Sequence, residues 1–151
     1  MPDLDALYQE IILDHNRRPR NYGELAGADR TVAGRNPLCG DEMTLWVRVE
    51  DDRIAEAKFV AQGCAVSKAS ASLMTTAVKG KTREEAAQLF DRVHKLVTGK
   101  LAAEEREGMG PLAALGGVAK FPIRVKCASL PWHALRKALD GGGAKEPVTT
   151  E

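Results

Sequence analysis

The spacing of hydrophobic residues changes twice along the chain, and each change marks a different kind of predicted element. Residues 3–17 carry apolar side chains at the intervals of one helix face, namely Leu4, Leu7, Ile11 and Ile12. This spacing predicts an amphipathic helix, and Pro19 and Gly23 predict that it ends soon after Arg17.

Residues 43–62 alternate with the period of two that is typical of strands. The apolar positions of the first run are Met43, Leu45, Val47 and Val49. The small and apolar positions of the second run are Ala55, Ala57, Phe59 and Ala61. This alternation assigns Ile54 to the outward face, and the turn at 51–53 predicts an antiparallel hairpin. Thr31 and Val32 predict a third strand beside it.

From Gly63 onward the pattern is helical again. The predicted segments are 64–80, 81–99, a short helix and loop within 98–110, a helical turn at 111–118 and a last helix at 121–140. Gly80 predicts the end of the first of these helices, and Thr82 and Glu85 stand in the register of a capping box at the start of the next. Pro131 predicts a kink or a restart in the last helix.

The order of helix, strands and further helices is typical of an α+β domain. We therefore predict a small antiparallel three-stranded sheet with helices packed on one face. A chain of 151 residues favours one domain, which we assign to residues 1–140. The glycine-rich residues 141–151 are predicted to form a flexible tail.

Composition and charge narrow the classes of partner. The chain has 22 basic and 21 acidic residues, so it offers no electrostatic footprint for nucleic acid or for an anionic membrane. No apolar run approaches the length of about 20 residues that a membrane helix needs. The acidic start "MPDLDALYQE" does not resemble a secretory signal, so we expect a cytoplasmic protein. Three widely spaced cysteines are expected to be reduced thiols there.

Each cysteine stands beside a feature that favours the thiolate form. Cys39 precedes Gly40 and Asp41 in a loop, Cys64 follows a glycine at the start of a helix, and Cys127 follows Lys126. A helix N-terminus and a neighbouring cation both stabilise a thiolate. Any one of these thiols alone fits a packing cysteine, whereas three in such settings indicate a shared site.

Three sulfurs and one carboxylate oxygen form a closed tetrahedral set if they converge. The set consists of Cys39, Asp41, Cys64 and Cys127. Such donors suit zinc, and sulfur-rich sets also suit iron–sulfur clusters. The surplus negative charge of the site requires compensation, for which Arg124 and Lys126 are the candidates unless both are simply solvated. His15, His94 and His133 are poorly placed as ligands.

Four motifs together resemble one family. They are "YQEIILDHNRRPRNYG", "NPLCGD", "GCAVSKASASLM" and "FPIRVKCASLPWHAL". The chain resembles the IscU/SufU family of iron–sulfur cluster assembly proteins, which includes NifU N-terminal-like domains, over residues 1–140. Lys126 stands where the IscU branch has a histidine, no LPPVK segment is present, and residues 98–117 resemble the insertion of the SufU branch. The resemblance implies that Cys39, Asp41, Cys64 and Cys127 meet at one exposed end of the domain.

The resemblance also implies sulfur chemistry rather than conventional enzyme turnover. A pyridoxal-phosphate cysteine desulfurase of the SufS/IscS type would pass a persulfide sulfur to Cys39 or Cys127, and downstream assembly proteins would receive the product. In a scaffold version, a transient iron–sulfur cluster forms on the three thiolates with Asp41 as the labile ligand. In a sulfur-transfer version, which the SufU-like features favour, zinc holds the four ligands at rest.

Two alternatives belong to other classes. A small structural zinc module would use the same ligands only for folding energy. A thiol enzyme would use Cys64 as the nucleophile, but it needs a nearby base that no histidine supplies. Exposure discriminates between these ideas, because a structural site is expected to be buried and an assembly site to lie at the surface.

Overall fold

The computed structural model describes residues 4–36, 40–141 and 148–149. The helices are α1 (Leu4–Arg17), α2 (Ala65–Val78), α3 (Arg83–Val97), α4 (Ala103–Glu107), the 3-10 helix η1 (Gly110–Lys120) and α5 (Pro122–Gly141). The strands are β1 (Arg30–Asn36), β2 (Asp41–Glu50), β3 (Arg53–Gln62) and β4 (Val148–Thr149).

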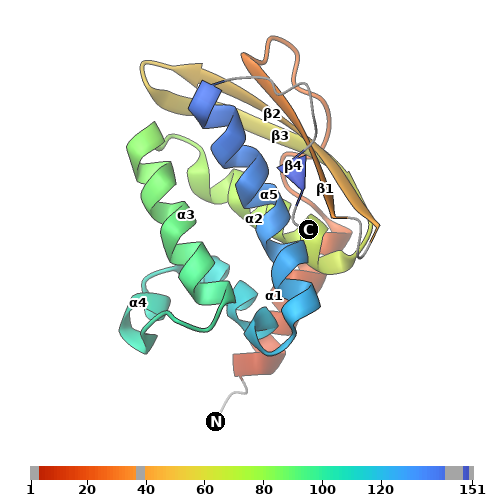
Figure 1. Ribbon diagram of the computed structural model, residues 1–151, viewed down its shortest axis with the longest axis vertical. Helices are drawn as coiled ribbons and strands as arrows, with labels where there is room; N and C mark the ends of the chain where they lie inside the picture. Colours follow the sequence, from red (N-terminus) through yellow and green to blue (C-terminus); the bar gives the residue numbers. More distant parts are fainter. Residues whose placement is uncertain (1–3, 37–39, 142–147, 150–151) are drawn as a thin grey trace.

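The sheet is antiparallel over its three long strands, and the helices cover one of its faces (Figure 1). The prediction of an α+β fold with a three-stranded antiparallel sheet is confirmed. Strand β4 adds a fourth, two-residue strand that runs parallel to β1, with Val148 opposite Gly34. The sequence analysis did not predict this strand, which lies in the segment assigned to the tail, because two residues are too few to show a periodicity.

The β2–β3 hairpin contains a bulge that changes which residues face the core. Asp51 and Asp52 have φ values of 50° and 64°, as a two-residue hairpin turn of the primed type requires. Arg48 then pairs with Glu56 but Val49 pairs with Ile54, so one residue of β3 has no partner. The bulge turns Ile54 into the core with no exposed surface. The predicted outward position of Ile54 was therefore wrong.

The core lies between the inner sheet face and helices α2 and α5. Its largest fully buried side chains include Leu45, Phe59 and Trp132. Helix α5 continues through Pro131, so the predicted restart does not occur. Ser70 of α2 supports this stretch of α5, because its hydroxyl donates to the Ala128 carbonyl at 2.6 Å and accepts from Trp132 Nε1 at 3.2 Å.

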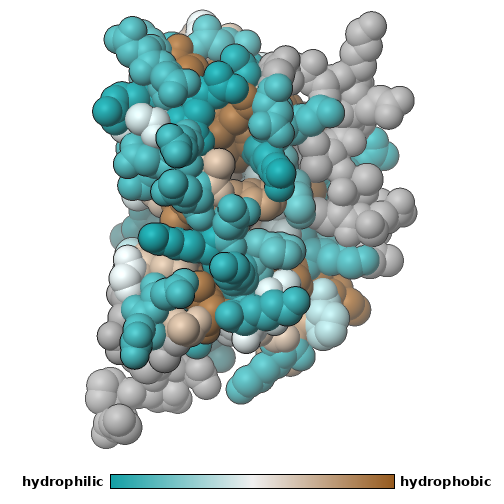
Figure 2. All heavy atoms as spheres, turned by 60° about the vertical axis from the view of Figure 1, so that its left-hand side comes forward, coloured by the Kyte–Doolittle hydropathy of each residue, from teal (hydrophilic) through white to brown (hydrophobic). Residues whose placement is uncertain are grey.

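The helices on the far side of the core present a hydrophilic surface. Helix α3 begins with the predicted capping box, in which Thr82 and Glu85 each bond the other's backbone N–H. Figure 2 shows that the face carrying α3 and α4 is covered mainly by hydrophilic residues. None of the described helices combines the length and the apolar character that a bilayer crossing requires.

His15 links the first helix to the core and gives the fold a dependence on pH. Its Nδ1 lies 2.7 Å from the Ser72 hydroxyl, which already accepts the Arg20 backbone N–H. In a neutral ring, Nδ1 can accept the hydroxyl proton of Ser72 while the same oxygen accepts the Arg20 N–H. Burial lowers the pKa of His15 below its usual value, so the unfolded chain takes up a proton before the folded one does.

We expect the free energy of unfolding to fall as the pH drops below about 6.5, the ordinary histidine value, by at most about 1.4 kcal/mol per pH unit for each buried histidine. A His15→Gln variant should show a shallower fall in urea denaturation measured from pH 7 to 5. Some slope should remain, because burial also lowers the pKa of His133. The comparison is with the wild type, and an equal slope in both proteins would refute the role of His15.

Candidate metal centre

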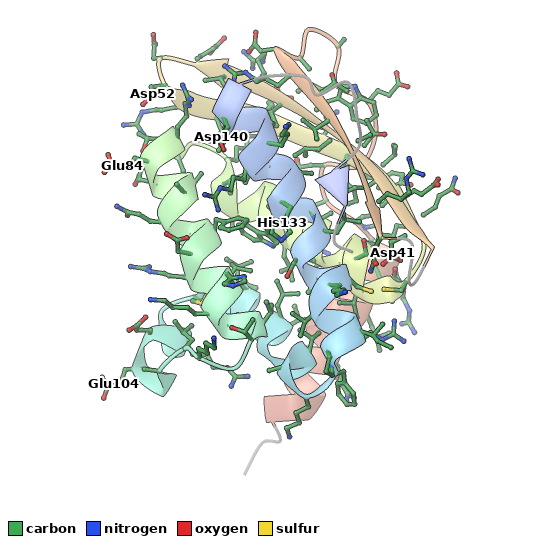
Figure 3. All side chains as sticks on the ribbon, viewed as in Figure 1. Asp41, Asp52, Glu84, Glu104, His133 and Asp140 are labelled. Atoms are coloured by element: carbon green, nitrogen blue, oxygen red, sulfur yellow. The ribbon has the colours of Figure 1, made fainter. Side chains whose placement is uncertain are left out.

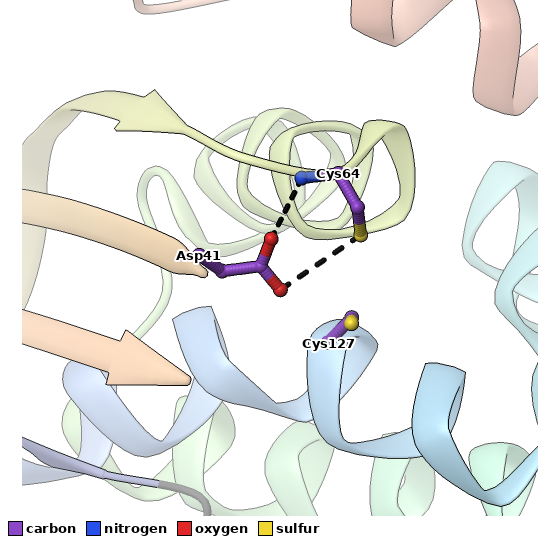
Figure 4. Close-up of side chains that lie close together, drawn as sticks. All are labelled: Asp41, Cys64 and Cys127. Atoms are coloured by element: carbon purple, nitrogen blue, oxygen red, sulfur yellow. Dashed lines mark hydrogen bonds between the residues drawn. The ribbon is translucent and has the colours of Figure 1, made fainter. Parts of the chain in front are cut away.

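Three of the four predicted ligands meet in space although they are far apart in the sequence. Asp41 begins β2, Cys64 precedes α2, and Cys127 lies in the second turn of α5. One ligand atom of each residue lies within 4.8 Å of the others. The close-up in Figure 4 shows the three side chains together. The group lies at the end of the sheet away from Asp52 and the hairpin turn (Figure 3). Cys39 lies outside the described residues.

Glycine at position 63 allows β3 and α2 to approach Asp41 closely. Gly63 has a φ of 126°, and a Cβ atom there would lie 2.2 Å from Asp41 Oδ1. Cys64 follows as the N-cap residue of α2, and its own side chain makes no capping bond. Its backbone N–H instead donates to Asp41 Oδ1 at 2.6 Å. The turn from β3 to α2 therefore binds the Asp41 carboxylate through its backbone and places the Cys64 thiol beside it.

The Asp41 carboxylate is fully buried, and its described hydrogen-bond partners are neutral groups. Its Oδ2 lies 3.4 Å from Asn36 Nδ2 and 3.8 Å from Cys64 Sγ, and no ion pair to Asp41 is present among the described residues. A buried carboxylate with only neutral partners is costly, and thiolates beside it add to the same charge. The donor set thus fits a divalent, thiophilic ion such as zinc.

Exposure differs among the ligands. Cys64 is partly exposed, whereas Asp41 and Cys127 have no accessible surface. The site is therefore accessible to solvent at Cys64. Its two other described ligands are buried, including Cys127 on α5. Hydrogen bonds reach both oxygens of Asp41, and its role as the labile ligand of the scaffold version stays a prediction.

Asn36 is a residue of the site that the sequence analysis missed. It is fully buried at the end of β1, and its Nδ2 lies 3.4 Å from both Asp41 Oδ2 and Cys127 Sγ. A signal was available, because Val32 and Gly34 are the preceding inward positions of β1. Continuing that alternation places the polar Asn36 on the inner face, three residues before Cys39.

The remaining candidates lie outside the ligand group. Arg124 is exposed and Lys126 is half-buried on the first turns of α5, and their role in charge compensation stays a prediction. His15 bonds Ser72, while the rings of His94 and His133 contact Phe90. His15 is buried, His133 is half-buried and His94 is exposed.

The fold and the site together define a class, namely small α+β proteins that gather thiolates and a carboxylate from distant segments around one position. The chain matches the family described as the NifU-like N terminal domain over residues 7–128, and it belongs to that family. The resemblance to the IscU/SufU group that the four motifs indicated is therefore confirmed.

Individual relatives carry two kinds of description. The chain is 42% identical to the zinc-dependent sulfurtransferase SufU of Bacillus subtilis, over 95% of this chain and 94% of that one. It is 39% identical to the iron-sulfur cluster assembly scaffold protein IscU of Streptococcus pyogenes, over 98% of this chain and 92% of that one. A solved structure from Fervidobacterium islandicum, described as a candidate assembly scaffold for the SUF system, superposes with a TM-score of 0.81 at 34% identity, covering 91% and 100% of the two chains.

Proposed function

We propose that this protein accepts sulfur from a cysteine desulfurase for iron–sulfur cluster assembly, and that Cys39, Asp41, Cys64 and Cys127 hold zinc at rest. The observation that carries the proposal is the convergence of Asp41, Cys64 and Cys127, from three separate elements, within 4.8 Å. The relative described as a zinc-dependent sulfurtransferase supports the role of the metal. Bound zinc would keep the ligand cysteines deprotonated.

The sulfur-transfer step needs an accessible thiolate. The thiolate attacks the outer sulfur of the desulfurase persulfide, a new S–S bond forms on this chain, and the desulfurase cysteine leaves as a thiolate. Cys127 has no accessible surface, which disfavours it as the acceptor. Of the two predicted acceptors we therefore favour Cys39. Cysteines that must stay reduced require a reducing compartment, so we place this chemistry in the cytoplasm.

The second candidate function is the scaffold, in which iron and sulfide assemble on the three thiolates as substrates. The Streptococcus pyogenes relative, described as an assembly scaffold, favours this role. In both versions the partner is a pyridoxal-phosphate desulfurase of the SufS/IscS type, and downstream assembly proteins or iron–sulfur acceptors take over the product. A structural zinc module would need neither partner.

Persulfide mapping tests the proposal. The zinc-loaded protein is incubated with a cysteine desulfurase and L-cysteine in the absence of iron, and each cysteine is analysed by mass spectrometry. We expect a persulfide on Cys39, faster desulfurase turnover, and loss of both in Cys39→Ser but not in an Asp29→Asn control on the exposed surface. An absence of persulfide, followed by cluster absorption once iron and sulfide are added, would favour the scaffold. An absence of both signals would favour the structural module.

A further inference from the structure

The side chain of Asn36 connects two predicted ligands that come from different elements. Its Nδ2 lies 3.4 Å from Oδ2 of Asp41 on β2 and 3.4 Å from Sγ of Cys127 on α5. Asn36 and Asp41 also pair directly across the β1–β2 ladder, so the backbone fixes the distance between them. One amide group can thereby hold a carboxylate and a thiolate in a constant relation.

The orientation of the amide follows from the chemistry around it. A carboxylate and a thiolate only accept hydrogen bonds, so the NH₂ group must face them and the oxygen must point away. The oxygen, Oδ1, is buried and has no hydrogen-bond partner among the described residues. An orphaned buried acceptor destabilises a fold. Its presence in a fully buried residue indicates that the NH₂ group serves the site rather than the stability of the core.

The ligand residues differ in how firmly hydrogen bonds and burial fix their side chains. Asp41 accepts hydrogen bonds at both oxygens, from Cys64 N–H and from Asn36, and Cys127 is buried beneath the same amide. The thiol of Cys64 is partly exposed, and its described hydrogen bond is the long contact of 3.8 Å to Asp41. The anchored side of the site is thus the Asp41–Cys127 pair.

We propose that Asn36 is a positioning residue that keeps Asp41 and Cys127 as the permanent ligands, so that ligand exchange takes place at the other two thiolates. This inference rests on the proposed four-ligand metal site and adds which of its ligands exchange. Hydrogen bonds from outer groups fix the geometry of metal ligands, and removing one typically weakens metal binding about 10- to 100-fold.

Limited alkylation of the zinc-loaded protein tests the inference. With N-ethylmaleimide and mass spectrometry, we expect Cys127 to react last of the three cysteines in the wild type. In Asn36→Leu, which keeps the shape but removes the donor, Cys127 should lose this protection and zinc affinity should fall about 10- to 100-fold in competition with a chelator. Asn36→Ser retains one donor and should preserve the order of reaction. The matched control is Asn21→Gly, since this amide bonds Thr75 away from the site and glycine tolerates the φ of 57° at this position.

Cobalt substitution supplies a readout that a purely structural role would not change. The charge-transfer and ligand-field bands of bound Co²⁺ should shift in Asn36→Leu and stay constant in Asn21→Gly. Cys127 reacting early in the wild type would overturn the inference, whether or not any variant folds. An unchanged order and affinity in Asn36→Leu would overturn it as well. Failure of the wild type to bind zinc or Co²⁺ would instead refute the proposed function.

Discussion

A Gly63→Ala substitution is expected to destabilise the protein by about 4 kcal/mol and to abolish tight zinc binding. The added Cβ would lie 2.2 Å from Asp41 Oδ1 and 2.7 Å from Asp41 Cα, and the second of these atoms belongs to the backbone of β2. Neither can move without breaking the bond from Cys64 N–H to the carboxylate. The backbone conformation, with a φ of 126°, adds strain of about 1–3 kcal/mol, and forced overpacking adds a similar amount.

Gly23 provides a matched control for the backbone term. Its φ is 128°, but a Cβ atom there would meet nothing within 4 Å. Gly23→Ala should therefore show only the strain of about 1–3 kcal/mol and normal zinc binding. Urea denaturation in chelator and zinc titration would be measured for both variants. If the two variants lose the same stability and bind zinc equally, the close contact between Gly63 and Asp41 does not constrain the site.

Local patterns made much of this architecture predictable. The capping box of Thr82 and Glu85 and the alternation from Met43 to Val49 depend on neighbours a few residues away, so the sequence alone reveals them. The gathering of Asp41, Cys64 and Cys127 was predicted by thiolate-favouring surroundings and by family motifs rather than by any pattern that encodes distance. The structure supplies that distance.

The features that escaped prediction depend on contacts between distant segments. The bulge that buries Ile54 follows from the pairing of two strands, because nothing within β3 itself breaks the alternation. The bond between His15 and Ser72 joins residues that are 57 positions apart. The hydrogen bonds to both oxygens of Asp41 arise where β1, β2 and the start of α2 meet, and no local pattern relates these three segments.

Charge connects the metal site to the stability of the fold. Asp41 is buried without a cationic partner among the described residues, and every described hydrogen bond to it comes from a neutral group. The metal-free protein therefore bears a desolvation cost that a bound cation removes. The charge of this carboxylate should lower the stability of the metal-free protein and raise its affinity for metal. A substitution that removes only the charge can test both effects.

An Asp41→Asn variant should be more stable than the wild type without metal and less stable with it. In chelator, removal of the buried charge is expected to raise the free energy of unfolding by about 1 kcal/mol, because the amide oxygen can still accept the Cys64 N–H. The new NH₂ group would face the Asn36 amide, which must turn over to accept from it and then gives up its bond to Cys127. With free zinc about 1,000-fold above the wild-type Kd, zinc adds about 4.1 kcal/mol to the wild type.

Loss of the anionic ligand should weaken zinc binding at least about 100-fold, which leaves the variant about 1.4 kcal/mol of stabilisation at the same zinc concentration. Urea denaturation curves with chelator and with zinc give all four values. The control is Glu42→Gln on the next residue of β2, which is exposed and should change neither curve by more than about 0.5 kcal/mol. If Asp41→Asn destabilises the metal-free protein, Asp41 stabilises the fold through its hydrogen bonds, and its buried charge carries no net cost that a metal would remove.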